Sequence, residues 1–460
     1  MNKLLLFVAG SLCMLSNSSS FAQDTPYTLN VFDHAVYYGM YEATVTEPIP
    51  AGAIRHSNSS YAKMLTEEQL QSFGNTLTMT VKLNPLCDNY DRIGNVNLAF
   101  VPKGLTTYSY SEVTRIEIGR FITPFMHLQI EPDEVPYVYE VDNLTSIFHD
   151  ENITSQYDLW IELEVYGYQG GPGQGGAAEE IAVCEGRNDV YMGTLDFESG
   201  NNPNIEYSNN FVLPLSYKLE LKNYDLSGTD VLGETTKTIT FTVPNDVPNA
   251  KLYFINSNHG SNNNGEEYNR RWHYLKMDGE PILSYRPGGL SCVPYSVYNT
   301  QPNCIYLQCN LAGAPPRPNT NAAWSWNNWC PGNKIPIRVI DLGTLEAGEH
   351  EFNIEVPAAV FPEGQGYFPM SIYLQGGDEA LAASSFENVS FNLSPNPVNE
   401  IAELTSTEMI QSVRIYNTLG QNVYTGTDTT LNLGGLEAGV YMVEVSFEGD
   451  KTATRKIIKN

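Results

Sequence analysis

The chain has 460 residues, of which 42% are hydrophobic and 17% are charged, a composition too apolar for a disordered chain and too polar for a membrane protein. Its length predicts roughly three domains, and its 37 Gly and 27 Pro favour a turn-rich β-protein. Asp and Glu number 53 against 25 Lys and Arg, so the net charge of −28 excludes the basic footprint of nucleic-acid binding and attraction to an anionic membrane surface.

Residues 1–22 are predicted to be a signal peptide. Lys3 gives a short positively charged start, residues 4–15 are an apolar stretch, and Ser20-Phe21-Ala22 has the small residues of a cleavage site. The apolar stretch is too short for a membrane span, and no later segment reaches about 18 unbroken apolar residues. We therefore expect an exported protein without a membrane span.

Beyond the signal peptide, alternation with a period of two dominates the sequence. Apolar and polar residues alternate over residues 76–83, 218–222 and 239–243, and only residues 65–73 form a short amphipathic helical stretch. Such strands bury one face, which predicts antiparallel sheets packed as sandwiches. Polar or small residues interrupt the pattern at 198–210 and 376–385, so we predict domains over 24–200, 205–376 and 385–460.

The first group of candidate functional residues lies in Cys87-Asp88-Asn89-Tyr90-Asp91-Arg92, directly before a strand over residues 95–101. Asp91 beside Arg92 is either an ordinary loop ion pair or a catalytic acid with its charge partner. The spacing alone does not decide between them.

The second group lies on a strand around Ile161. One face of this strand is apolar, and the other carries Trp160, Glu162, Glu164, Tyr166 and Tyr168. Aromatic rings offer flat surface to a sugar ring and carboxylates accept its hydroxyl protons, whereas a solvated sheet face is the alternative interpretation. The Gly-, Pro- and Gln-rich residues 169–177 follow and could lie over a site.

The third group spans residues 265–274 in the second domain. Alternation places Glu267, Asn269, Arg271 and His273 on one face. The ordinary interpretation is an ion pair between Glu267 and Arg271 on one face, with His273 as a structural histidine.

Six cysteines remain after removal of the signal peptide, and an even number in an exported protein favours disulfides. The preferred pairs are Cys292–Cys330 and Cys304–Cys309, and Cys87–Cys184 is the remaining pair. Zinc is the rival interpretation, but the sequence has no C-x-x-C motif, no His near a Cys at ligand spacing and no H-x-H or H-E-x-x-H pattern. We expect neither a metal nor another cofactor.

The C-terminal domain is predicted to be a small immunoglobulin-like β-sandwich. It contains "FNLSPNP" at 391–397, "VRIYNTLGQ" at 413–421 and "GVYMVEV" at 439–445. In order and in amino-acid sequence, these segments resemble the C-terminal sorting domain of type IX secretion. That resemblance implies recognition by the type IX secretion machinery and a secreted or cell-surface location.

Three motifs of the first two domains resemble the peptide-N-glycosidase F family. They are "CDNYDRIGNVNL" at 87–98, "IEIGRFITPF" at 116–125 and "WCPGNKIPIRVIDL" at 329–342, and the resemblance covers about residues 27–376. It implies an all-β molecule with two adjacent jelly-roll antiparallel β-sandwiches followed by the C-terminal β-sandwich. It also implies a metal-independent amidase that cleaves between asparagine and the first N-acetylglucosamine of N-glycans on peptides or proteins.

The resemblance also implies roles for single residues. Asp91 matches the principal catalytic aspartate, Glu164 the first-domain glutamate and Glu267 the second-domain glutamate. The substrate-binding residues we expect around these three acids are Arg92, Glu162, Trp160, Tyr166, Arg271, His273 and Trp326. Tyr166 and Trp326 replace a tryptophan and an arginine of the family pattern, which puts the glycan contacts in doubt. Lys82, Gly265 and Asn269 stand where the family has cysteines.

The mechanistic hypothesis places Asp91 at the scissile linkage, where it activates water, and Arg92 lowers its pKa so that it stays ionised near neutrality. Glu164 and Glu267 hold and polarise the two ends of the linkage. A site that draws on both sandwiches predicts a cleft at their interface. An endoglycosidase, or a non-catalytic N-glycan-binding protein of the same fold, is the alternative.

Overall fold

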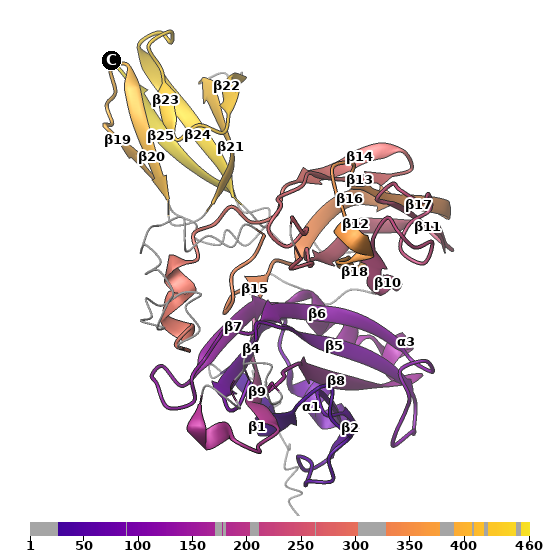
Figure 1. Ribbon diagram of the computed structural model, residues 1–460. Helices are drawn as coiled ribbons and strands as arrows, with labels where there is room; N and C mark the ends of the chain where they lie inside the picture. The colour runs from indigo at the N-terminus through magenta and orange to yellow at the C-terminus, as the bar shows by residue number, and fades with distance from the viewer. Residues whose placement is uncertain are drawn as a thin grey trace, which may run out of the picture.

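The computed structural model describes residues 26–88, 90–170, 177, 181–202, 211–262, 264–301, 328–377, 391–406, 409–417, 422–447 and 452–460. Antiparallel strand pairs build almost all of it, and Figure 1 shows them gathered into three bodies in chain order. The prediction of an all-β molecule is confirmed. No helix in the described ranges is long and apolar enough to cross a membrane. The predicted signal peptide lies outside the described residues.

The first domain is a sandwich of two sheets around one core. The first sheet has the order β1-β9-β4-β7 and consists of Tyr27–Tyr38, Asp189–Gly200, Thr76–Pro85 and Val135–Glu140. The second sheet has the order β15-β6-β5-β8-β3-β2 and consists of Lys334–Ile335, Thr114–Ile122, Ile93–Pro102, Tyr157–Val165, Ser60–Met64 and Ala53–Ser57. Alternate residues of β4, among them Met79 and Val81, are buried in the shared core, as their period predicts.

Short helices close this domain. They are α1 (Glu67–Ser72), α2 (Asn143–His149), α3 (Glu151–Thr154) and η1 (Ala182–Cys184). The amphipathic stretch at 65–73 predicts α1, which begins with a capping box between Thr66 and Gln69 and buries Leu70.

The second domain repeats the sandwich arrangement. One sheet has the order β10-β18-β12-β16 with Phe211–Leu221, Phe368–Gly376, Val247–Asn256 and Arg338–Leu345. The other has the order β11-β17-β13-β14 with Thr236–Val243, Gly348–Glu355, His273–Met277 and Glu280–Tyr285, and η2 (Val293–Tyr298) and η4 (Pro362–Gly364) lie in its loops. Both sheets contribute to a core of their own.

The third body contains β19-β20-β23 (Phe391–Ser394, Ile401–Ser406, Thr430–Asn432) and β22-β21-β24-β25 (Asn422–Gly426, Ile410–Asn417, Gly439–Phe447, Thr452–Lys459). Its hydrophobic core is separate from the other two. The sheets agree with the three predicted domains in number, whereas the exact domain boundaries stay predictions.

The first two domains are joined by backbone and by buried polar contacts. Residues of the second domain form β15, which pairs with β6 of the first domain through Lys334 and Ile335. Arg120 of β6 is buried, forms an ion pair with Glu117 and donates to Ser257 Oγ at 2.9 Å. These contacts hold the two sandwiches side by side.

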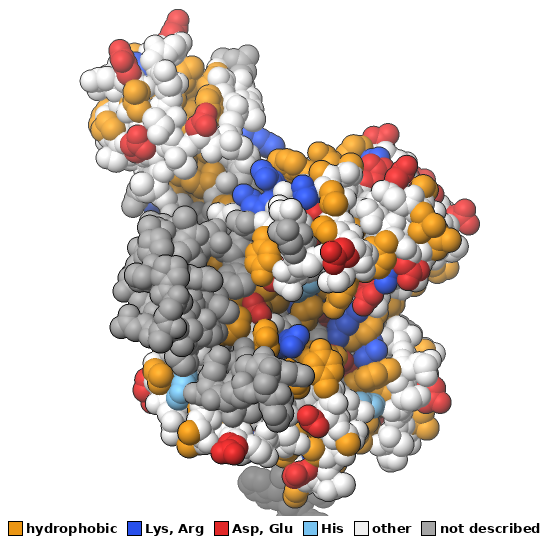
Figure 2. Space-filling model, viewed as in Figure 1, with side chains coloured by type: hydrophobic (Ala, Val, Ile, Leu, Met, Phe, Trp, Pro, Cys, Tyr) orange, Lys and Arg blue, Asp and Glu red, His pale blue; other side chains and the backbone are white. Residues whose placement is uncertain are grey.

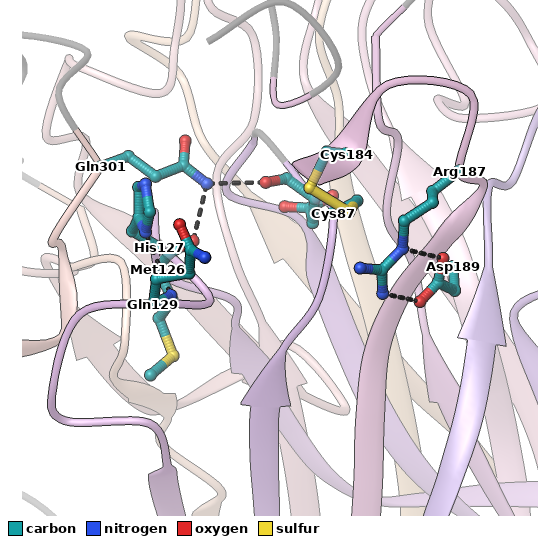
Figure 3. The surroundings of a disulfide bond; sticks show 9 residues. Cys87, Met126, His127, Gln129, Cys184, Arg187, Asp189 and Gln301 are labelled. Carbon is teal, nitrogen blue, oxygen red and sulfur yellow. Dashed lines mark hydrogen bonds and ion pairs between the residues drawn. A yellow bond between two sulfur atoms is a disulfide. The ribbon is translucent and has the colours of Figure 1, made fainter. Parts of the chain in front are cut away.

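Two disulfides lie among the described residues, Cys87–Cys184 and Cys292–Cys330. Both pairs are among the predicted ones, and the predicted Cys304–Cys309 pair lies outside the described residues. Figure 3 shows Cys87–Cys184 beside the ion pair between Arg187 and Asp189.

Candidate active site

A cavity of about 570 Å³ lies where the first two domains meet, and Lys and Arg side chains gather along this junction in Figure 2. Both domains line it. The first contributes Met40, Tyr41, Asp91, Arg92, Asn95, Arg120 and Tyr166, and the second contributes Lys218, Glu220, His259, Glu267, Trp329 and Tyr367. Of the ten residues predicted for the site, Asp91, Arg92, Tyr166 and Glu267 therefore share one cavity.

The loop before β5 places Asp91 at the cavity, and Asp88 fixes that loop. The Asp88 carboxylate accepts hydrogen bonds from Tyr90 N at 2.9 Å, Tyr168 N at 2.7 Å and Tyr191 Oη at 3.0 Å. From the second domain, Gln301 Nε2 donates to the backbone oxygen of Asp88 at 2.6 Å and to that of Met126 (Figure 3). The loop is thus tied to both domains.

Asp91 is electrostatically unusual. Its Oδ2 is buried and accepts no hydrogen bond from any described residue. Burial first, and the nearby Glu267 carboxylate second, raise the pKa of Asp91 to about 8, although Arg92 acts in the opposite direction. The prediction that Arg92 keeps Asp91 ionised near neutrality is therefore wrong, because burial outweighs the neighbouring charge.

Arg92 forms no ion pair with a described residue and lies over the Tyr90 ring. Its guanidinium carbon lies 5.0 Å from the centroid of the Tyr90 ring, and its Nε is buried without a hydrogen-bond partner in the described chain. Its backbone is anchored at both ends by Thr123, which accepts from Arg92 N at 2.8 Å and donates to Arg92 O at 2.9 Å. Arg92 therefore lines the cavity with other parts of its side chain, while its Nε is shielded from solvent.

Glu267 enters the cavity from a loop of the second domain. Its backbone nitrogen donates to Gly260 O at 3.3 Å, and its Oε2 accepts from Gly260 N at 3.4 Å. Asn328 Nδ2 donates to the backbone oxygen of Glu267 at 2.7 Å. The next residue, Trp329, donates from its ring nitrogen to Asn258 O at 2.8 Å. The motif that starts at Trp329 and the Asn328 before it therefore contact the segment that carries Glu267.

The alternation predicted over residues 265–274 is wrong, because turns occupy residues 266–268 and β13 begins only at His273. Arg271 forms its ion pair with Glu266 at 2.8 Å and not with Glu267. His273 is buried and stacks on Tyr285 with the ring centroids 4.7 Å apart. Burial lowers the pKa of His273 to about 3, so the interpretation as a structural histidine agrees with its surroundings. Neither Arg271 nor His273 lines the cavity.

The polar face of β8 is buried, so its interpretation as a solvated sheet face is wrong. Glu162 accepts from Tyr108 Oη at 2.6 Å, and burial raises its pKa. Trp160 packs on Tyr108 with the ring centroids 5.6 Å apart. Neither Glu162 nor Trp160 lines the cavity. Trp326 lies outside the described residues.

Glu164 lies directly behind the cavity wall. Its Oε2 accepts from Tyr166 Oη at 3.0 Å and from Lys218 Nζ at 2.5 Å, and both donors line the cavity. Burial pushes the pKa of Glu164 upward, but Lys218 and Arg115 outweigh it and the pKa is lowered. Glu164 is therefore an ionised group that reaches the cavity through its two partners.

Most other residues that line the cavity were not predicted for the site, among them the charged or titratable Arg120, His259 and Lys218. Arg120 stands in a motif that we had noted, but nothing in the motif marks it as buried. His259 and Lys218 gave no signal, since a lone His and a Lys on an alternating strand are common. His259 Nε2 lies 2.7 Å from Ser257 Oγ, and burial together with Arg120 lowers its pKa to about 3, so the ring is neutral.

The chemistry available here is that of carboxyl groups and hydrogen-bond donors. Across the described residues, no group of three or more His, Cys, Asp or Glu is placed to hold a metal ion. One protonated acid, a second acid facing it and several fixed donors can bind an amide or acetal and transfer protons to it.

Comparison with known protein families gives three matches. The family described as peptide-N-glycosidase F, N terminal, matches residues 28–168, and peptide-N-glycosidase F, C terminal, matches residues 229–375. The secretion system C-terminal sorting domain matches residues 392–460. A search of the curated proteins found no match.

Solved structures with the same fold include PNGF-II in two crystal forms. They are 19% and 18% identical to this chain, with TM-scores of 0.51 and 0.50, and cover 76% and 77% of it. The match spans 66% and 65% of those chains, just under two thirds of their length. A recombinant peptide N-glycanase F is 15% identical, with 77% of this chain and 96% of that chain covered and a TM-score of 0.46.

Proposed function

Since the chain belongs to the peptide-N-glycosidase F family, we propose that it hydrolyses the amide bond between asparagine and the innermost N-acetylglucosamine of N-glycans. The substrates would be N-glycosylated peptides or proteins, and the products a peptide that carries aspartate and a glycosylamine. The observation that carries the proposal is a single cavity lined by Asp91 from one domain and Glu267 from the other.

The nitrogen of an amide is a poor leaving group and must gain a proton as the bond breaks. With a pKa of about 8, Asp91 carries a proton at neutral pH and is the donor we propose. Glu267 faces it and takes a proton from the attacking water, whose oxygen bonds to the side-chain carbonyl carbon. Each transfer contributes about 10²–10⁴-fold. The C–N bond breaks, and the proton of Asp91 leaves with the nitrogen.

Other groups on the wall would bind and orient the substrate. Arg92 lines the same cavity as Asp91, and its guanidinium group would donate to a substrate oxygen. Tyr166 and Tyr41 offer aromatic surface to a sugar ring, and Glu164 acts from behind the wall by holding Tyr166 and Lys218. Arg271 supports the loop that carries Glu267 through its ion pair with Glu266, and neither Arg271 nor His273 lines the cavity.

The sorting domain at residues 392–460 supports a secreted or cell-surface location. We propose that the type IX secretion machinery recognises it. Amide hydrolysis on external glycoproteins agrees with such a location.

The test is to incubate the protein with an N-glycosylated peptide and weigh the peptide by mass spectrometry. Conversion of the glycosylated asparagine to aspartate supports the proposal. A peptide that keeps one N-acetylglucosamine indicates an endoglycosidase, and an unchanged peptide indicates binding alone; either result refutes the amidase.

Asp91→Asn tests the assigned acid in the same assay. The amide keeps the shape of the side chain but has no acidic proton, so we expect turnover to fall by about 10²–10⁴-fold while the circular dichroism spectrum stays that of the wild type. Asp341→Asn, an exposed position on β16, is the matched control and should leave turnover unchanged. Normal turnover by Asp91→Asn would refute the role of this residue.

A further inference from the structure

Lys218 stands at an irregularity in β10. Where β10 pairs with β18, Ser216 lies opposite Ile372 and Leu219 opposite Met370, so Tyr217 and Lys218 together face the single residue Ser371. Such a bulge re-aims side chains and is frequent beside active sites. Lys218 also has a φ of +48°, a left-handed conformation that is uncommon for residues other than glycine.

The bulge turns two consecutive side chains toward the first domain. On a regular strand, Tyr217 and Lys218 would point to opposite faces. Here the Tyr217 ring packs against Arg115, with the guanidinium carbon 4.1 Å from the ring centroid, and Lys218 Nζ reaches Glu164. Ser371 Oγ accepts from Lys218 N at 3.0 Å and so stabilises the unusual backbone. The local strain is maintained by several specific contacts.

Two oxygen acceptors hold the Lys218 ammonium group, and the Tyr217 and Tyr166 rings flank it with their centroids 5.2 Å and 6.0 Å from Nζ. Its Nζ donates to Asn95 Oδ1 at 2.8 Å and to Glu164 Oε2 at 2.5 Å. An ammonium has three N–H donors, and the third finds no acceptor among the residues that the structure describes. The side chain lines the cavity and stays 24% exposed, whereas the Glu164 side chain beneath it is 3% exposed. The cation therefore faces the cavity and its counter-ion does not.

We propose that Lys218 is a substrate-binding residue of this cavity, fixed by Glu164 and Asn95 so that its remaining N–H donates to an oxygen of the chitobiose core. The proposal rests on the proposed function for the identity of the ligand. It assigns Glu164 the role of a positioning residue, which acts through Lys218 and Tyr166.

The experiment measures binding of N,N′-diacetylchitobiose by titration calorimetry to the full-length protein. Lys218→Met removes the donor, and we expect the Kd to rise by about 10- to 100-fold, as for the loss of one charged hydrogen bond. Lys276→Met is the matched control. Like Lys218, Lys276 forms an ion pair with a glutamate, here Glu355, but it does not line the cavity. Its Kd should equal that of the wild type.

A double-mutant cycle separates binding from charge compensation. If Lys218 contacts the sugar, the double variant Lys218→Met/Glu164→Gln binds no more tightly than Lys218→Met, since removal of the Glu164 charge does not restore the lost donor. If Lys218 only neutralises Glu164, the double variant regains the Kd of Glu164→Gln alone. That recovery, or a wild-type Kd for Lys218→Met, overturns the proposal.

Hydrolysis of the glycopeptide by the wild type is scored separately. Binding of the disaccharide through Lys218 without hydrolysis refutes the proposed function but not the role of Lys218. Hydrolysis by the wild type, together with unimpaired binding by Lys218→Met, refutes only the role of Lys218. A wild type that does not bind the disaccharide refutes this inference directly.

Discussion

Asp88 and Asp91 lie three residues apart in one loop, yet their surroundings give them different roles. Both pKa values are raised, to about 7 and about 8, chiefly by burial. The Asp88 carboxylate accepts hydrogen bonds from two backbone N–H groups and one tyrosine hydroxyl. Oδ2 of Asp91, in contrast, accepts no hydrogen bond from a described residue. The first carboxyl group therefore shapes the loop, and the second belongs to a side chain that lines the cavity.

The raised pKa of Asp91 predicts the pH dependence of turnover. As a proton donor it is active below its pKa, so kcat/KM should fall as the pH rises through about 8. Glu267 is the second cause of the shift, and Glu267→Gln should therefore move this alkaline limb to lower pH while it lowers turnover. Profiles of kcat/KM against pH check both expectations.

The control for this experiment is Glu280→Gln, an exposed position on β14 that should leave the profile unchanged. An ionised base would give the opposite sign, with kcat/KM rising as the pH rises through about 8. Such a rise would contradict the assignment of Asp91 as the acid.

The sequence marks Asp91 through its motif but not its protonation state. Adjacency to Arg92 suggests a stabilised carboxylate, because the order of residues shows charge neighbours and not burial. Asp91 is desolvated and also lies near the charge of Glu267 from a second-domain loop, and only the folded chain contains that information. Lys218 is hidden for the same reason, since its partner Glu164 lies 54 positions away.

At the scale of elements, the period of two places side chains on the correct faces of β8 but does not show what covers each face. The apolar face packs in the core, and the polar face, with Glu162 and Glu164, is covered by residues of β10 and of neighbouring loops. The bulge in β10 also leaves no mark in the sequence, because Tyr217 and Lys218 continue a regular alternation. The burial of a strand face by another domain can therefore be seen only in the folded structure.

The Cys87–Cys184 disulfide belongs to the element that carries Asp91, and its removal tests that link. The bond closes a separation of 97 residues, so Cys87→Ser combined with Cys184→Ser should lower the free energy of unfolding of the first domain by about 4–5 kcal/mol. Because Cys87 precedes the Asp88 anchor, turnover should fall as well. Urea denaturation and the glycopeptide assay measure the two effects.

The comparison is the double serine variant of Cys292 and Cys330, a pair separated by 38 residues in the second domain. It should cost about 4 kcal/mol and act on the second domain. Equal stability of the Cys87/Cys184 variant and the wild type would contradict the prediction.

At the scale of the molecule, the cavity exists because two sandwiches are held in one arrangement. Arg120 is central to that arrangement, since it pairs with Glu117 and also donates to Ser257 Oγ and Pro369 O of the second domain. Tyr253 and Tyr373 of the second domain stack at 4.7 Å and pack against the core of the first. The sequence predicts the two sandwiches and a cleft between them, but contacts between domains follow no period and could not be predicted.

Arg120→Met should destabilise the protein by about 3–5 kcal/mol, because it leaves the buried Glu117 carboxylate without its cation. Adding Glu117→Gln removes that charge, so the double variant should regain much of the loss. Differential scanning calorimetry measures the stability, and the glycopeptide assay shows whether the cavity survives. A single variant as stable as the wild type would show that the pair does not hold the domains together.

The last prediction concerns the C-terminal domain. Its hydrophobic core is built from residues between 391 and 457 and shares none with the other two cores, and the cavity is lined entirely by residues 40–369. A chain that ends at residue 377 should therefore keep the kcat/KM of the full-length protein. The sorting domain should matter for export instead, so the truncated chain should be missing from the cell surface and medium when fractions are assayed. A folded truncated chain with impaired turnover would mean that the C-terminal domain contributes to the site, and unchanged export would mean that it does not direct secretion.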